Sequence, residues 1–131
     1  MLLFLVRHAH AEPGEPDELR PLSPRGRSEA AALGARLAAH PTPPELILTS
    51  PLRRACETAE AIAEHVPAEV RIDERLAPGA TADAVRELLA GLEGPVAAVG
   101  HQPDCSEIAR ELTGSDPGFP TAGVAEITLP A

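Results

Sequence analysis

The stretch Leu2-Leu3-Phe4-Leu5-Val6-Arg7-His8 decides the fold class, because an unbroken apolar run over residues 2–6 stops abruptly at two polar residues. A short continuous apolar run with a polar end is typical of a strand that is buried on both faces. Pro95-Val96-Ala97-Ala98-Val99-Gly100-His101 repeats the pattern, and Leu46-Ile47-Leu48-Thr49-Ser50 is a shorter version of it. We therefore expect three buried strands that end in polar side chains.

Segments with helical periodicity separate these apolar runs. Ser23 can cap a helix with Pro24 at its first position, and we expect this helix to continue to about His40, where a proline-rich stretch stops it. The other predicted elements are helices that begin at Pro51 and at Thr81, a helix over residues 104–113, and strands over residues 69–72 and 123–129.

Strands that alternate with helices imply right-handed crossovers and a mainly parallel sheet. The length of 131 residues suits one domain, so we expect a single domain over residues 1–131. The predicted fold is α/β, a three-layer α/β/α sandwich with residues 123–129 as an edge strand. Such sheets bind ligands beyond the carboxyl ends of their strands, which is where Arg7-His8, Thr49-Ser50 and Gly100-His101 are expected.

Composition restricts the partners and the compartment. Twenty acidic and eleven basic residues give a net charge of −9, and such a field disfavours nucleic acid and anionic membranes as partners. The only aromatic residues are two phenylalanines, too few to form a platform on which bases stack. Two cysteines cannot form a disulfide framework, and the apolar run over residues 2–6 is too short for a signal peptide or a membrane span. We therefore expect a cytoplasmic protein.

Two histidines and several arginines at predicted strand ends favour phosphoryl chemistry. A guanidinium matches the charged oxygens of a phosphoryl group bidentately, as Arg7 and Arg54 could do here. A neutral imidazole such as that of His8 can attack phosphorus and carry it covalently, while a second one, His101, can hydrogen-bond the equatorial oxygens. This chemistry requires no metal, and the sequence offers no compact carboxylate cluster for magnesium, so no cofactor is expected.

A zinc site is the competing interpretation of His8 and His10. Two histidines at positions i and i+2 of a strand share a face and could bind zinc. We disfavour this interpretation because the neighbouring Arg7 would repel the ion and because the sequence lacks further ligands at a suitable spacing.

Three motifs resemble those of the histidine phosphatase (phosphoglycerate mutase-like) superfamily. Leu5-Val6-Arg7-His8-Ala9 resembles its arginine-histidine signature, Ser50–Ala59 resembles its second motif, and Val99-Gly100-His101-Gln102-Pro103 resembles the third. The short length, Ala9 where many members have glycine, and Arg20-Pro21-Leu22-Ser23 are similar to the compact branch that includes the bacterial phosphohistidine phosphatases.

The resemblance implies a set of site residues: His8 as the nucleophile, Arg7, Arg54 and His101 as the phosphate pocket, and Asp17 and Arg20 at its border. Longer members carry a glutamate general acid after the third strand and an inserted lid over the site. Here residues 73–94 leave no room for a large lid. Glu74 is the candidate for the general acid, and its alternative role is a solvated carboxylate in a turn.

The resulting prediction is a metal-independent phosphatase that works through a covalent phosphohistidine on His8. A protonated imidazole, with a pKa of about 6.5 when free, leaves more easily than an alkoxide. An open site without an assigned acid therefore favours phosphohistidine on a protein as the substrate. Two alternatives stay open: a phosphatase of a small phosphorylated metabolite, and a non-catalytic module that binds phosphorylated partners.

Overall fold

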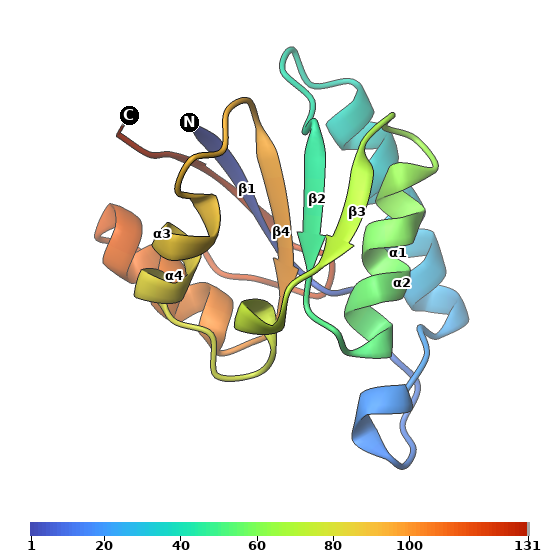
Figure 1. Ribbon diagram of the computed structural model, residues 1–131. Coiled ribbons are helices and arrows are strands. Elements are labelled where there is room, and N and C mark those ends of the chain that lie inside the picture. The colour runs from blue at the N-terminus through green and yellow to red at the C-terminus, as the bar shows by residue number, and fades with distance from the viewer. Residues whose placement is uncertain (131) are drawn as a thin grey trace.

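The computed structural model describes residues 1–130 and contains one five-stranded mixed sheet (Figure 1). Its strands lie in the order β3-β2-β4-β1-β5. The first four are parallel, and β5 pairs antiparallel with β1 at the edge, which confirms the predicted α/β class and its C-terminal edge strand. The strand bounds are β1 Leu2–Arg7, β2 Leu46–Thr49, β3 Glu69–Ile72, β4 Val96–Gly100 and β5 Val124–Thr128.

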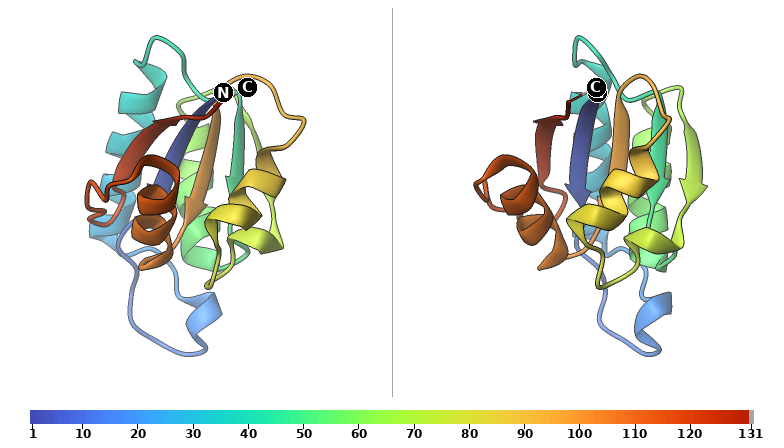
Figure 2. Two further views of the ribbon diagram at one scale, coloured as in Figure 1. Left: turned by 90° about the vertical axis from the view of Figure 1, so that its left-hand side faces the viewer. Right: turned by 60° about the vertical axis from the view of Figure 1, so that its left-hand side comes forward.

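Helices cover both faces of the sheet, and successive side chains of β1 point alternately into the hydrophobic cores on the two faces. Phe4 and Val6 belong to the core beneath α1 and α2, whereas Leu3 and Leu5 belong to the core beneath α3 and α4. The two helical layers are visible on opposite sides of the sheet in Figures 1 and 2. The α-helix bounds are α1 Pro24–Ala38, α2 Arg53–Ala63, α3 Ala82–Leu89 and α4 Asp104–Thr113. The three-layer sandwich is thereby confirmed.

Local sequence explains where two of these helices begin. The Ser23 side chain accepts a hydrogen bond from the Gly26 amide, and Pro24 occupies the first helical position, as predicted. The Thr81 side chain likewise caps α3 by accepting from the Ala84 amide.

The predicted bounds of β3 and α4 are confirmed, whereas those of α1 and α2 differ slightly from the structure. Helix α1 ends at Ala38 rather than near His40, and α2 begins at Arg53 rather than at Pro51. Two short 3-10 helices, η1 Asp17–Leu19 and η2 Glu74–Leu76, were not predicted because three residues carry no hydrophobic period.

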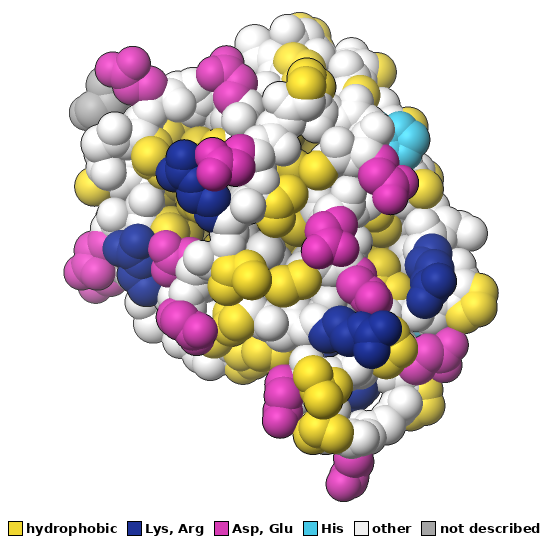
Figure 3. Space-filling view, turned by 45° about the vertical axis from the view of Figure 1, so that its right-hand side comes forward, with side chains coloured by type: hydrophobic (Ala, Val, Ile, Leu, Met, Phe, Trp, Pro, Cys, Tyr) yellow, Lys and Arg dark blue, Asp and Glu magenta, His cyan; other side chains and the backbone are white. Residues whose placement is uncertain are grey.

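The carboxyl ends of β1, β2 and β4 meet at one edge of the sheet, at the lower end in Figure 1. The segment between β1 and α1, which carries η1, projects beyond that edge in Figures 1 and 2. Figure 3 views the α1 and α2 side and shows acidic side chains scattered among arginines, without one continuous patch of either sign. Within residues 1–130, no helix is long and apolar enough to cross a membrane.

Candidate active site

The sheet brings the two predicted histidines together across 93 positions of sequence. His8 directly follows β1 and His101 directly follows β4, and these strands are parallel neighbours with Arg7 opposite Gly100. The His8 amide donates to the Gly100 carbonyl (3.0 Å), which continues the ladder by one residue. The two imidazole centroids lie 5.2 Å apart with the rings tilted by 58°. Both histidines therefore line one small region, as the strand-end argument predicts.

The His8 backbone and ring are held in one arrangement. The ring Nδ1 lies 2.7 Å from the Ala9 carbonyl oxygen, and because a carbonyl can only accept, Nδ1 carries the proton. A neutral imidazole has one N–H, so Nε2 keeps its lone pair. The Ala9 amide donates to Thr58 Oγ1 (3.0 Å), and the His8 carbonyl accepts from the Ala122 amide (3.1 Å). Nε2 is thus the ring nitrogen of His8 that carries the lone pair, and it is the atom that could act as a nucleophile.

The surroundings of His8 keep its ring neutral. The pKa of His8 is lowered to about 4, and burial is the largest cause. The charges of Arg54, Arg7 and Arg20 contribute to this lowering, whereas the hydrogen bond to the Ala9 carbonyl opposes it. At neutral pH the ring is therefore unprotonated, as an attacking imidazole must be. The same three cations provide a positive field at the place where a transferred phosphoryl group would carry its negative charge.

His101 is buried and is held by Ser50, a contact that sequence reasoning did not predict. Its Nε2 lies 2.7 Å from Ser50 Oγ, and that hydroxyl accepts a hydrogen bond from the Leu52 amide (3.3 Å). Burial is the largest cause that lowers the pKa of His101 to about 4, followed by the nearby His8 and Arg54. Its Nδ1 is buried without a hydrogen-bond partner among the described residues, so this nitrogen is available to a ligand.

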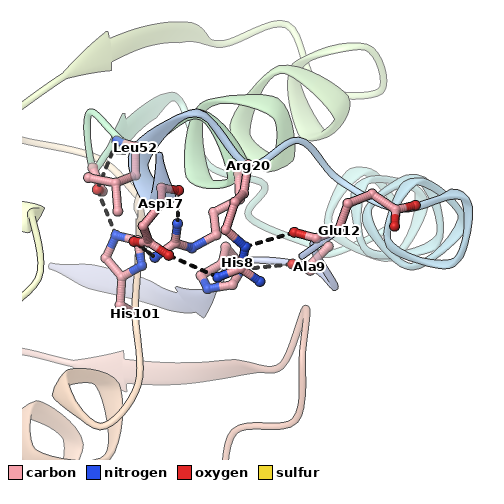
Figure 4. Close-up of polar contacts among 9 residues, drawn as sticks. His8, Ala9, Glu12, Asp17, Arg20, Leu52 and His101 are labelled. Carbon is pink, nitrogen blue, oxygen red and sulfur yellow. Dashed lines mark hydrogen bonds and ion pairs between the residues drawn. The ribbon is translucent and has the colours of Figure 1, made fainter. Parts of the chain in front are cut away.

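Arg54 enters the site from the first turn of α2, where it is buried. Its Nη1 donates to the Asp17 carbonyl (3.0 Å) and its Nη2 to Asp17 Oδ2 (3.2 Å). Arg20 donates from Nη1 to Asp17 Oδ1 (3.0 Å) and from Nε to the Glu12 carbonyl (2.7 Å). Figure 4 shows this cluster beside His8 and His101. Asp17 and Arg20 therefore lie at the border of the predicted pocket. Arg20 forms an ion pair within the loop, and its charge also acts on His8.

Arg7 completes the cluster from the end of β1. Its Nη1 donates to the Phe119 carbonyl (2.9 Å), while its Nε is buried without a partner among residues 1–130. Arg53, next to Arg54 in sequence, instead forms an exposed ion pair with Glu57 (3.1 Å) and takes no part in this cluster.

Glu74 and His10 lie apart from this group of contacts. Glu74 is exposed at the start of η2, and its carboxylate makes no hydrogen bond or ion pair with another described residue. His10 directs Nδ1 to Ser23 Oγ (2.6 Å) at the start of α1. Among residues 1–130 no three histidine, cysteine, aspartate or glutamate side chains are placed to hold a metal ion. The role of Glu74 as a proton donor stays a prediction.

The histidines and arginines gathered at the strand ends agree with the family to which the sequence can be assigned. The profile of the histidine phosphatase superfamily, branch 1, matches residues 3–78, and the chain belongs to that superfamily. The matched range contains His8 and Arg54 but not His101, so the structure independently brings the third motif to the first two.

Among individual proteins, the chain is similar to the phosphohistidine phosphatase SixA of Escherichia coli, with 28% identity over 98% of the chain and 86% of that protein. The structure of the protein histidine phosphatase SixA in complex with tungstate superposes with a TM-score of 0.88 and 27% identity, covering 98% of this chain and 88% of that one. A rat mitochondrial serine/threonine-protein phosphatase, PGAM5, is 35% identical over 56% of the chain, a match that spans only 26% of that protein.

Proposed function

We propose that this protein is a phosphohistidine phosphatase that transfers the phosphoryl group to His8 and then to water. The observation that carries the proposal is the state of His8, whose Nδ1–H is bound to the Ala9 carbonyl and whose Nε2 has no hydrogen-bond partner among residues 1–130. Three guanidiniums act on this neutral ring. The similarity to SixA over nearly the whole chain supports the same substrate class.

The proposed reaction has two displacements at phosphorus. In the first, the lone pair of His8 Nε2 forms a bond to phosphorus while the P–N bond of the substrate phosphohistidine breaks. The substrate imidazole, already protonated on its other ring nitrogen, keeps the electron pair of that bond and leaves as a neutral ring. In the second, water attacks phosphorus, the bond between His8 Nε2 and phosphorus breaks, and both protons of the water stay with the released orthophosphate while His8 returns to its neutral form. Arg7, Arg54 and the free Nδ1 side of His101 would hold the phosphoryl oxygens through both steps.

The choice of a phosphoramidate follows from the carboxylates around the site. The hydrogen bond from Arg20 and the charge of Arg54 lower the pKa of Asp17, which is ionised at neutral pH and cannot donate a proton. The Glu74 carboxylate has no hydrogen bond or ion pair within residues 1–130 that would fix it beside His8. An imidazole leaving group, which is protonated near neutral pH, needs less assistance than an alkoxide, so this set of residues favours P–N over P–O cleavage.

A macromolecular substrate is favoured by the connection between β3 and β4. This connection forms η2 and α3, and α3 packs its Val85, Leu88 and Leu89 against the sheet face rather than extending over the strand ends. The strand-end site is consequently approached past the short segment that carries η1 and not beneath a large insertion, which suits a phosphohistidine presented on a protein surface.

A trapping experiment tests the proposal. Wild type, His8→Ala and the matched control His65→Ala, an exposed histidine at the end of α2, are mixed with a labelled phosphohistidine protein, a phosphoserine peptide or a small phosphate monoester. We expect acid-labile, alkali-stable label on wild type and His65→Ala and none on His8→Ala, with the phosphohistidine donor consumed fastest. Faster turnover of the small ester would instead indicate a metabolite phosphatase. Neither label nor release from any donor would indicate a module that only binds phosphorylated partners.

A further inference from the structure

A carboxylate of the chain itself lies between two arginines of the proposed phosphate pocket. One oxygen of Asp17 accepts from Arg20 (3.0 Å) and the other accepts from Arg54 (3.2 Å). The N–H groups of Arg20 and Arg54 that bind the Asp17 oxygens are the kind of donors that a phosphoryl group would also need. The Asp17 side chain and a bound phosphoryl group therefore compete for the same N–H groups.

The contact of Asp17 with Arg20 and Arg54 involves charged groups that also act on the two histidines of the site. Arg54 and Arg20, which hold Asp17, both act on the His8 ring. Asp17 is also the one acidic group among the charges that act on His101. A phosphoryl group held by Arg54 and His101 would thus share its surroundings with an ionised carboxylate, and like charges repel.

The two sides of this contact differ in how firmly they are held. The Asp17 side chain is 60% exposed, and η1 has no buried residue and no side-chain cap. The Arg54 side chain is only 9% exposed, and its Nη1 is bound to the Asp17 backbone carbonyl independently of the carboxylate. The carboxylate can therefore rotate into water while the guanidinium keeps its position.

We propose that Asp17 is an internal competitor for oxyanions that sets the affinity of this pocket, so that orthophosphate is held weakly and leaves readily after hydrolysis. The inference rests on the proposed function, because it assigns the phosphoryl group to the same arginines. A macromolecular substrate offsets the competition through its further surface contacts, whereas free orthophosphate has none.

Titration calorimetry with orthophosphate tests the inference on wild type, Asp17→Asn and the matched control Glu18→Gln. Asparagine keeps the backbone bond to Arg54 and nearly the same volume but removes the charge. Glu18 is the next residue of η1, is exposed, and makes no side-chain hydrogen bond or ion pair with another described residue, so its variant removes the same charge without breaking a bond to the arginines. We expect Asp17→Asn to bind orthophosphate about tenfold more tightly than wild type, equivalent to about 1.4 kcal/mol, and Glu18→Gln to bind like wild type.

Three results would overturn the inference. Equal affinities would show that the carboxylate does not compete, and weaker binding by Asp17→Asn would show that Asp17 instead orders the arginines for the ligand. An equal gain in orthophosphate affinity by Glu18→Gln would show that the effect comes from the net charge of the protein and not from the contact of Asp17 with the arginines. The trapping experiment tests the proposed function separately. Label on His8 together with equal orthophosphate affinities would support the phosphatase and refute the competition by Asp17. A tenfold gain in affinity without label on His8 would support the competition and refute the phosphatase.

Discussion

Replacing His8 by glutamine should make the stability of the protein less sensitive to acid. The folded ring has a pKa of about 4 against 6.5 for an unperturbed histidine, so between these values the unfolded chain binds a proton that the folded protein does not. Stability from this group is complete above pH 6.5 and is lost as the pH falls from 6.5 to 4. The loss is about 1.4 kcal/mol per pH unit, or about 2 kcal/mol between pH 7 and pH 5.

Urea denaturation of wild type and His8→Gln at pH 7, 6 and 5 measures this contribution. The other titrating groups are common to the two proteins, so the difference between their pH slopes reports His8 together with its effect on the neighbouring His101. Wild type should lose about 2 kcal/mol more than the variant on going from pH 7 to pH 5. Parallel curves for the two proteins would refute the reasoning, because they would mean that the His8 ring takes up its proton equally well in the folded state.

Three further substitutions test the site and its support. Arg54→Lys should weaken orthophosphate binding about tenfold or more in a calorimetric titration, because an ammonium lacks the paired N–H groups of a guanidinium; unchanged affinity would remove Arg54 from the pocket. Ser50→Ala should lower the free energy of unfolding by about 1–3 kcal/mol by leaving Nε2 of buried His101 without its partner, and an unaltered urea midpoint would contradict this. Gly26→Ala should cost about 3 kcal/mol or more, since its Cβ would overlap the His10 carbonyl oxygen, and a wild-type thermal melt by circular dichroism would argue against that contact.

The buried strands could be predicted closely because burial on both faces leaves a continuous apolar run. Residues 2–6 were predicted as a strand that the structure extends by one residue, to Arg7. The end of α1 was predicted less well, since Ala39 and His40 close a tightened turn through backbone bonds that any side chain could make. The nearby prolines mark where the chain leaves the helix but not its last helical residue.

The site could be predicted as far as it depends on strand ends and motifs, and not where it depends on tertiary contacts. The proximity of His8 and His101 could be predicted because each follows a strand of a parallel pair, and the carboxyl ends of parallel strands lie at the same edge of the sheet. Ser50 was noted only as a polar strand end, because nothing local indicates that its hydroxyl reaches His101. Thr58, one helical turn after Arg54, carries a detectable signal, since that spacing places both side chains on the face of α2 toward the site.

The strand order determines when the chain can become active during synthesis. β1 has β4 and β5 as its only neighbours in the sheet, so the strand that precedes His8 finds its first pairing partner only after β2 and β3 have been made. A nascent chain that has not reached Val96 leaves this apolar strand unpaired and lacks His101. Closing such a distant contact is slow compared with local helix formation, which exposes β1 to chaperones or to aggregation in the meantime. The same topology leaves a ribosome-bound fragment without the paired histidines until β4 has joined the sheet.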